Sequence, residues 1–209
     1  MKPFRNRADA GIQLAAVLAW RDWTDPVVFG LVRGGLPVAA PVARELDAPL
    51  ELLVARKIGA PGRPELGLGA VAADGTPFFD RAGLRALGLT TDDVAHLVDR
   101  ARTEARDQVR RYLGGRVPRS PAGRDVVVVD DGVATGGTAI AGLRALRSYA
   151  PLRRVFAAPV GAPSALDKLA READELVCLQ EPEEFRAVGE FYADFSPTSD
   201  DEVLALVPK

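Results

Sequence analysis

Two adjacent aspartates, Asp130 and Asp131, follow an uninterrupted run of four valines and precede a loop rich in glycine and threonine. Four consecutive valines leave no polar face, a pattern typical of a central strand in a parallel sheet that helices cover on both sides. Carboxylates that follow such a strand lie at the carboxyl edge of the sheet, where ligands bind, because an apolar interior does not accept them unpaired. Two acceptors side by side can hold a vicinal diol.

The loop after the aspartates is predicted to bind an anion. Its glycines allow a tight turn that exposes backbone N–H groups, and its threonines add hydroxyl donors. These residues are Gly132, Thr135, Gly136, Gly137 and Thr138. The segment from Ala139 to Ser148 is predicted to be a helix, so its N-terminus lies under the anion, as suits a phosphate monoester.

The string Val126-Val-Val-Val-Asp-Asp-Gly-Val-Ala-Thr-Gly-Gly-Thr138 resembles the phosphoribosyl-pyrophosphate (PRPP) binding motif of the type I phosphoribosyltransferases. The resemblance implies that Asp130 and Asp131 bind the ribose 2′- and 3′-hydroxyls and that the following loop wraps the 5′-phosphate. The loop residues concerned are Ala134, Thr135, Gly136, Gly137 and Thr138. The alternative is a glycine-rich turn without a ligand. A Walker A loop is disfavoured, because no lysine follows the last glycine.

A second glycine motif, Leu31-Val-Arg-Gly-Gly35, follows the first predicted strand. Exposed N–H groups beside a guanidinium suit an anion. The motif is similar to the pyrophosphate loop of the same family, which implies that Arg33, Gly34 and Gly35 contact the leaving pyrophosphate. Arg56 and Lys57 follow the second predicted strand, and the resemblance makes them a further pyrophosphate contact. A solvated basic pair is the alternative there.

Strands and helices alternate along the chain, which predicts an α/β fold with one doubly wound parallel sheet, formed by a single domain over residues 1–209. The predicted strands are Val27 to Val32, Leu50 to Ala55, Asp125 to Val129, Arg153 to Pro159 and Glu175 to Leu179. The other predicted helices are Asp9 to Arg21, Pro37 to Leu46, Thr91 to Leu113, Ser164 to Glu172 and Ser199 to Leu206. The stretches from Ser164 and Ser199 begin with N-cap patterns.

Residues 58–90 are predicted to form a flexible flap, because glycine and proline interrupt any long element, with a hairpin at Gly67 to Pro77. A flap at the ligand edge would exclude water from the site, whereas a plain disordered loop is the alternative. Residues 181–209 are predicted to contribute a small hood over the acceptor pocket. Its candidate residues are Val133, Phe191 and Tyr192; the two aromatic rings either stack on the acceptor or fill the core of the hood.

The resemblance implies transfer of the 5-phosphoribosyl group from PRPP to a nitrogenous acceptor, a base or a small amine, with release of pyrophosphate. The candidate catalytic residues are Asp130 and Asp131, which fix the ribose, and Arg33 and Lys57, which stabilise the leaving group. Mg²⁺ is the expected cofactor; it would be bound through PRPP near the two aspartates, without an all-protein site. Ala134 stands where members that use 6-oxopurines commonly carry an aspartate, which disfavours hypoxanthine and guanine.

Composition narrows the alternatives. The 209 residues are 47% apolar, enough for one substantial core, and a net charge of −2 disfavours general nucleic-acid binding. The single Cys178 excludes an internal disulfide, and the absence of a signal sequence or a membrane-length apolar run predicts a cytoplasmic protein, with homo-oligomer formation left open. The chain looks most like stand-alone bacterial phosphoribosyltransferases. A non-catalytic PRPP-sensing regulator is the alternative, and PRPP or sugar-phosphate hydrolysis is a weaker one.

Overall fold

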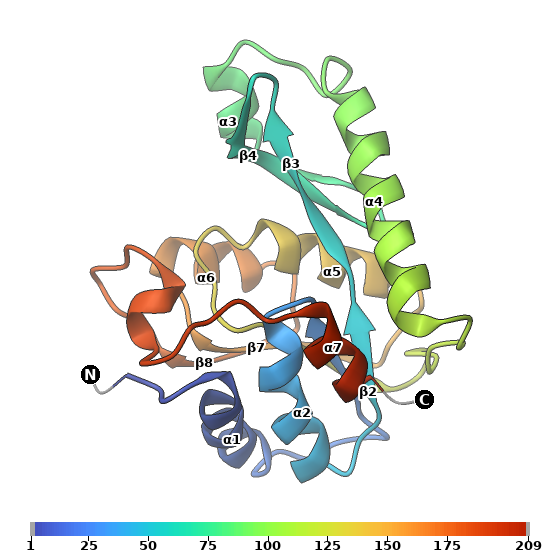
Figure 1. Ribbon diagram of the computed structural model, residues 1–209, viewed down its shortest axis with the longest axis vertical. Coiled ribbons are helices and arrows are strands. Elements are labelled where there is room, and N and C mark those ends of the chain that lie inside the picture. The colour runs from blue at the N-terminus through green and yellow to red at the C-terminus, as the bar shows by residue number, and fades with distance from the viewer. Residues whose placement is uncertain (1–2, 208–209) are drawn as a thin grey trace.

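The computed structural model, which describes residues 3–207, is built on a five-stranded parallel sheet (Figure 1). In order across the sheet, the strands are β2 (Leu50–Leu53), β1 (Val27–Leu31), β6 (Asp125–Val129), β7 (Arg153–Val160) and β8 (Glu175–Gln180). All neighbouring strands pair in parallel. Every predicted strand is therefore confirmed to within a few residues. The ends of the predicted domain, residues 1–2 and 208–209, lie outside the described residues.

Helices cover both faces of this sheet. One face packs against α1 (Arg7–Leu18), α2 (Gly35–Glu45) and α7 (Asp200–Leu206), and the other packs against α5 (Gly137–Arg147) and α6 (Pro163–Leu169). Val127 and Val129 of β6 belong to the first core, while Val126 and Val128 belong to the second. The apolar run thus serves two cores at once, and the doubly wound α/β fold is confirmed. Among residues 3–207, no helix combines the length and apolar character needed to cross a membrane.

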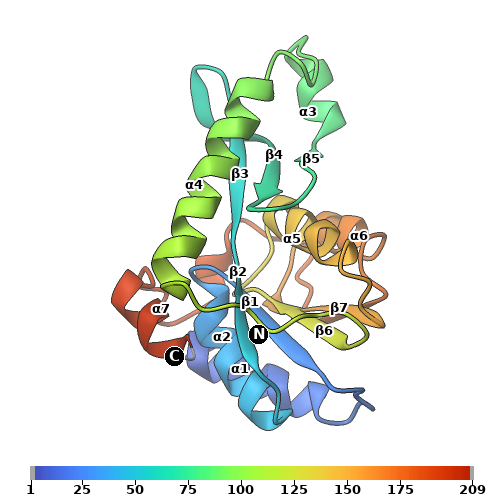
Figure 2. The same cartoon turned by 90° about the vertical axis from the view of Figure 1, so that its right-hand side faces the viewer.

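The segment predicted as a flexible flap contains regular elements, which rise above the sheet in Figures 1 and 2. They are β3 (Ala55–Ala60), β4 (Arg63–Ala72), β5 (Phe78–Phe79) and α3 (Arg81–Ala86), and the long helix α4 (Ala95–Leu113) packs beside them. The three strands form a separate antiparallel sheet.

The predicted hairpin at Gly67 to Pro77 corresponds to the turn from β4 into β5, which pair antiparallel at Gly69 and Ala70. A second hairpin, which the sequence did not predict, joins β3 to β4 and turns at Pro61 and Gly62, where Gly62 has a φ of 69°. Gly69 lies inside β4, and a side chain there would come within 2.0 Å of the Phe78 carbonyl oxygen. Glycine at this position permits the close approach of β5 and does not interrupt the strand.

Element boundaries differ from prediction in two informative places. The second predicted strand is divided, since β2 ends at Leu53 and β3 begins at Ala55. Helix α6 begins at Pro163 without a side-chain cap, so the predicted Ser164 cap is wrong; proline at the first helical position has no N–H to satisfy. The predicted cap at Ser199 is confirmed, because Ser199 and Glu202 form a reciprocal capping box.

Candidate active site

Asp130 and Asp131 lie directly after β6, at the carboxyl edge of the parallel sheet. The backbone N–H of Asp130 still donates to Ala157 of β7, at 3.2 Å, and the N–H of Asp131 donates to Asp130 Oδ1 at 2.9 Å. The chain then returns to β7, where the Val133 N–H donates to the Val160 carbonyl at 2.9 Å. These bonds fix the backbone on both sides of the acidic pair, so the two carboxyl groups occupy set positions.

The glycine loop after β1 touches the acidic pair. A side chain at Gly34 would come within 2.0 Å of Asp131 Oδ2, and one at Gly35 would come within 2.5 Å of the Val129 carbonyl oxygen. Only glycine allows this approach, and the preceding peptide bond between Val32 and Arg33 is cis. The structure therefore brings together the two loops that the sequence assigned to one ligand.

The third part is the loop from Ala134 to Thr138. Gly136 has a φ of 79° and immediately precedes α5, whose first residue is Gly137. Ala134 and Thr135 are exposed, whereas Gly137 and Thr138 are partly buried. Because the first N–H groups of a helix lack partners within it, the start of α5 offers unpaired donors to an anion.

The surroundings of the acidic pair raise the pKa of both carboxyl groups. Burial raises the pKa of the Asp130 carboxyl well above its ordinary value, and the neighbouring Asp131 charge raises it further. Burial also raises the pKa of Asp131, although the Arg7 guanidinium opposes that shift. Two carboxylates this close cannot both ionise freely, so the pair is primed for ligands that donate hydrogen bonds or bring positive charge.

Arg7 contacts the acidic pair, which the sequence did not reveal. Its Nε donates to Asp131 Oδ2 at 2.7 Å, and the two side chains are 11% and 15% exposed. The partners lie 124 residues apart in the chain, so no local pattern predicts the contact. The available signal was an arginine at the very start of a helix, where a positive charge opposes the helix dipole and needs a separate reason.

The predicted cations take different positions. Arg33 Nη1 lies 3.5 Å from Asp200 Oδ1 at the start of α7, and Arg56 Nη2 donates to Glu104 of α4 at 3.0 Å. Lys57 lies on the opposite face of β3 from Arg56, because successive side chains of a strand alternate. Its strand partner is Ala70, whose Cβ would lie 3.9 Å from a side chain at Gly137. Of the pair, Lys57 is therefore on the face directed toward α5.

The hood joins the N-terminal residues to the C-terminal stretch. Phe4 donates its N–H to the Phe191 carbonyl at 2.8 Å, and its ring lies 5.4 Å from that of Tyr192. Tyr192 is 6% exposed and its hydroxyl donates to the Asp131 carbonyl oxygen at 2.5 Å. The ring of Phe191 stacks on Phe185, and Val133 is 3% exposed. Tyr192 thus reaches the acidic pair through its hydroxyl, while its ring fills the hood.

A cavity of about 580 Å³ lies elsewhere, between α4, α5 and the face of β1 and β2. Apolar side chains dominate its lining, among them Phe29, Leu53, Val109, Leu113 and Leu146. None of the predicted site residues lines it. The acidic pair and the Gly34–Gly35 loop lie at the carboxyl edge of the parallel sheet instead.

Comparison with known proteins agrees with this geometry. A family model described as phosphoribosyl transferase domain matches residues 5–196. Two Mycobacterium tuberculosis proteins with the provisional name phosphoribosyl transferase, from strains CDC 1551 and H37Rv, are each 41% identical over 209 residues, which is 100% of this chain. The chain spans about half the length of these curated relatives, 47% of each.

Two solved structures share the fold. The crystal structure of TT1426 from Thermus thermophilus is 41% identical, has a TM-score of 0.83, and is matched over 99% of this chain and 98% of that one. The AQ2163 protein from Aquifex aeolicus has a TM-score of 0.54 at 15% identity, over 96% of this chain and 86% of that one. At that identity the second likeness concerns the fold alone.

Proposed function

Because the chain belongs to the phosphoribosyl transferase domain family, we propose that it transfers the 5-phosphoribosyl group from PRPP to a nitrogenous acceptor and releases pyrophosphate. One observation carries the proposal: the acidic pair, the Gly34–Gly35 loop and the start of α5 meet at one edge of the sheet. Hydrogen-bond acceptors for the ribose diol would then lie beside hydrogen-bond donors for the pyrophosphate and for the 5′-phosphate, all around one bound sugar.

In this reaction a nitrogen of the acceptor forms a bond to C1 of the ribose while the bond from C1 to the pyrophosphate oxygen breaks. Positive charge develops on the sugar and negative charge on the leaving group. Asp130 and Asp131 hold the ribose hydroxyls and lie near the developing cation, while Arg33 and Lys57 stabilise pyrophosphate. The loop from Ala134 to Thr138 holds the 5′-phosphate and so fixes the sugar during the displacement.

The donor set suits Mg²⁺. Asp130 and Asp131 supply hard oxygen ligands, and residues 3–207 contain no group of three or more His, Cys, Asp or Glu side chains that could hold a metal by themselves. Asp130 and Asp131 would hold the ion together with PRPP, and the ion would neutralise charge on the departing pyrophosphate.

The acceptor is a base or a small amine. Ala134 is exposed at the start of the predicted 5′-phosphate loop and offers no carboxylate to a 6-oxopurine. Adenine and small amines are therefore favoured as acceptors over hypoxanthine and guanine. The hood supplies the upper wall of this pocket with Phe191 and Tyr192. Because the Tyr192 ring is buried, its contribution to an acceptor would come from its position at the edge of the pocket rather than from stacking.

A PRPP-sensing regulator is the second candidate, and the same site supports it because binding PRPP requires no acceptor. Calorimetry with PRPP and Mg²⁺ tests binding, and pyrophosphate release with a panel of nucleobases and small amines tests transfer. Acceptor-dependent release supports the transferase. Binding of PRPP without release for any acceptor supports the sensor, whereas release without an acceptor indicates hydrolysis. No heat with PRPP contradicts both main candidates.

A further inference from the structure

Arg7 is held by three different parts of the molecule. Its Nε donates to Asp131 Oδ2 at 2.7 Å, its Nη1 donates to the Ser196 carbonyl at 2.7 Å, and its guanidinium carbon lies 3.9 Å from the centre of the Phe195 ring. The side chain is 11% exposed. A planar guanidinium is suited to combine such in-plane hydrogen bonds with stacking on a ring.

The place of Arg7 in the helix makes a purely local role unfavourable. It is the first residue of α1, where a cation opposes the helix dipole, and Asn6 already caps the helix by accepting from the Asp9 N–H. Helix α1 therefore gains nothing from a positive charge at this position. The favourable partner is Asp131, whose largely covered carboxylate needs a compensating charge.

Arg7 also lies against the glycine loop. A side chain at Gly34 would come within 2.0 Å of Asp131 Oδ2 and within 3.2 Å of Arg7 Nε. Arg7, Asp131 and the backbone of Gly34 consequently form one packed group between the predicted ribose and pyrophosphate contacts. In addition, the Tyr192 hydroxyl donates to the main-chain oxygen of Asp131, so the hood holds this residue from a second side.

We propose that Arg7 is a positioning residue of the PRPP site: it binds Asp131 Oδ2 and thereby directs the other oxygen of that carboxylate to a ribose hydroxyl. The inference rests on the proposed function and deepens it. One carboxylate oxygen is sufficient to accept from one hydroxyl, so Arg7 and the sugar bind Asp131 together and do not compete. Release of Arg7 would break its bond to Ser196 and uncover Phe195, which favours a fixed support over a displaceable gate.

The test compares Arg7→Met, Arg7→Lys and the control Arg5→Met. Methionine removes the charge and the donors but keeps an apolar stem, and lysine keeps the charge with poorer geometry. Arg5 serves as the control because it is an arginine two residues before Arg7, its side chain is 80% exposed, and it pairs with Asp9. The measurements are PRPP binding by calorimetry, the KM for PRPP and kcat from pyrophosphate release, and thermal melting.

Arg7→Met is expected to raise the Kd and KM for PRPP about tenfold with kcat changed less than about threefold, because the ribose contact is made in both the ground and transition states. Arg7→Lys should recover part of the loss, and Arg5→Met should match the wild type. Because Arg7 acts through Asp131, adding Arg7→Met to Asp131→Asn should cost little more than Asp131→Asn alone.

Equal or tighter PRPP binding by Arg7→Met overturns the positioning role, and tighter binding would indicate a gate. Additive losses in the double variant also overturn it, since they mean that Arg7 acts independently of Asp131. If Arg7→Met does not melt as a folded protein, Arg7→Lys becomes the test variant. A Kd and a KM for PRPP equal to those of the wild type would then count against the inference. A wild type that binds no PRPP overturns the proposed function together with this inference, whereas binding by the wild type combined with an unaffected Arg7→Met overturns only the inference.

Discussion

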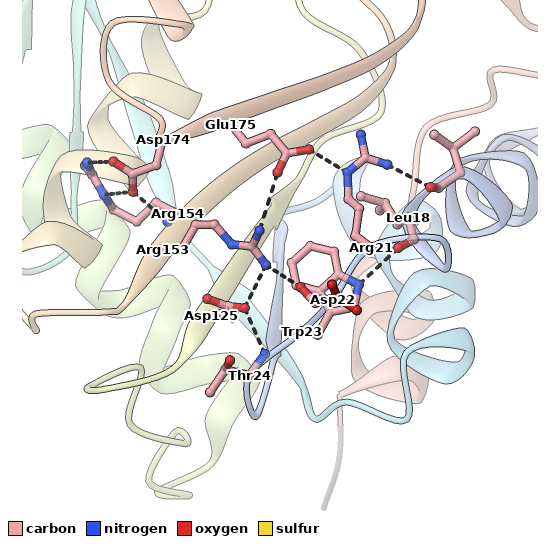
Figure 3. A network of polar contacts seen from close by, with 11 residues as sticks. Leu18, Arg21, Asp22, Trp23, Thr24, Asp125, Arg153, Arg154, Asp174 and Glu175 are labelled. Carbon is pink, nitrogen blue, oxygen red and sulfur yellow. Dashed lines mark hydrogen bonds and ion pairs between the residues drawn. The ribbon is translucent and has the colours of Figure 1, made fainter.

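Strand β6 has a carboxylate at each end, and the surroundings of the two ends differ. At the amino end, Asp125 is 4% exposed and accepts from the Thr24 N–H at 2.9 Å and from Arg153 at 2.8 Å (Figure 3). Arg153 also donates to the Asp22 carbonyl and lies 3.7 Å from Glu175, whose other oxygen accepts from Arg21. The negative charges of the two carboxylates in this network are therefore balanced by the positive charges of its two guanidiniums.

At the carboxyl end the balance is incomplete. Asp130 and Asp131 are adjacent carboxyl groups, and the Arg7 guanidinium forms an ion pair with Asp131. The amino edge is a closed network of the protein's own charges. At the carboxyl edge, the pKa values of Asp130 and Asp131 are raised and one guanidinium faces two carboxyl groups, so a ligand can supply the remaining hydrogen-bond donors or positive charge. Local imbalance of this kind marks a functional site more clearly than the number of charges does.

The largest expected effect comes from glycines near the two ends of β6. Gly136→Val should weaken PRPP binding at least about 100-fold, because a β-branched side chain obstructs the phosphate loop and strains a φ of 79°. Gly123→Val is the matched control: Gly123 has a φ of 66°, precedes β6 and has no neighbour within 4 Å of an added Cβ. It should lower stability by about 1–2 kcal/mol and leave binding intact. Calorimetry and thermal melting measure both. Equal binding losses would mean that backbone strain, not the phosphate loop, is responsible.

The aspartates should separate binding from stability. Asp130→Asn and Asp131→Asn replace charge-assisted acceptance, worth about 1.5–3 kcal/mol per contact, and should each weaken PRPP use about tenfold to a hundredfold. Asp125→Asn, on the same strand, should lower the melting temperature by about 3–10 °C and leave PRPP use unchanged. Kinetics and melting of the three variants test this. A stability loss in Asp130→Asn equal to that in Asp125→Asn would remove the distinction between the edges.

The amino-acid sequence predicted the parts of this site that depend on local pattern. The run of four valines predicts a strand, and the two aspartates after it mark the carboxyl edge of the sheet. The clustered glycines then predict a tight turn. The contact between the Gly34–Gly35 loop and the acidic pair agrees with parallel topology, since both come after strands that end at the same edge. These predictions needed only local periodicity and the rule that ligands bind at the carboxyl ends of parallel strands.

Contacts between distant segments could not be predicted in the same way. Arg7 meets Asp131 because α1 packs beside β7 and the C-terminal stretch returns over it, and no short pattern encodes that path. Gly69 was interpreted as an interruption because its partner, the Phe78 carbonyl, is invisible in the local sequence. Likewise, a buried Tyr192 hydroxyl bound to a main-chain oxygen gives no sequence signal.

Cations around the carboxyl edge should show a smaller effect. Lys57→Met should raise the KM for PRPP about threefold to tenfold, because its face of β3 is directed toward α5. Arg56→Met should change the KM less than about twofold, because Arg56 pairs with Glu104 on the α4 face. Both residues of that ion pair are nearly half exposed, so its loss should cost less than about 1 kcal/mol of stability. A larger KM effect for Arg56→Met would place the pyrophosphate contact on the other face of the hairpin.

The smallest effect concerns the pH dependence of stability without ligand. The pKa of Asp130 is raised in the folded state, so folding favours its protonated form. That contribution to stability is complete below the unfolded-state pKa, about 4, and is lost as the pH rises through the folded-state pKa.

Asparagine in place of Asp130 cannot ionise and still offers an oxygen to the Asp131 N–H. At pH 8, Asp130→Asn should therefore exceed the wild type in free energy of unfolding by about 1–2 kcal/mol, and the two should converge below pH 4. Asp125→Asn should instead be less stable than the wild type at pH 8, because Arg153 loses its negatively charged partner. Urea unfolding at several pH values measures these differences. Parallel curves for Asp130→Asn and the wild type would show that the charge at the carboxyl edge is already balanced without a ligand, as it is at the amino edge.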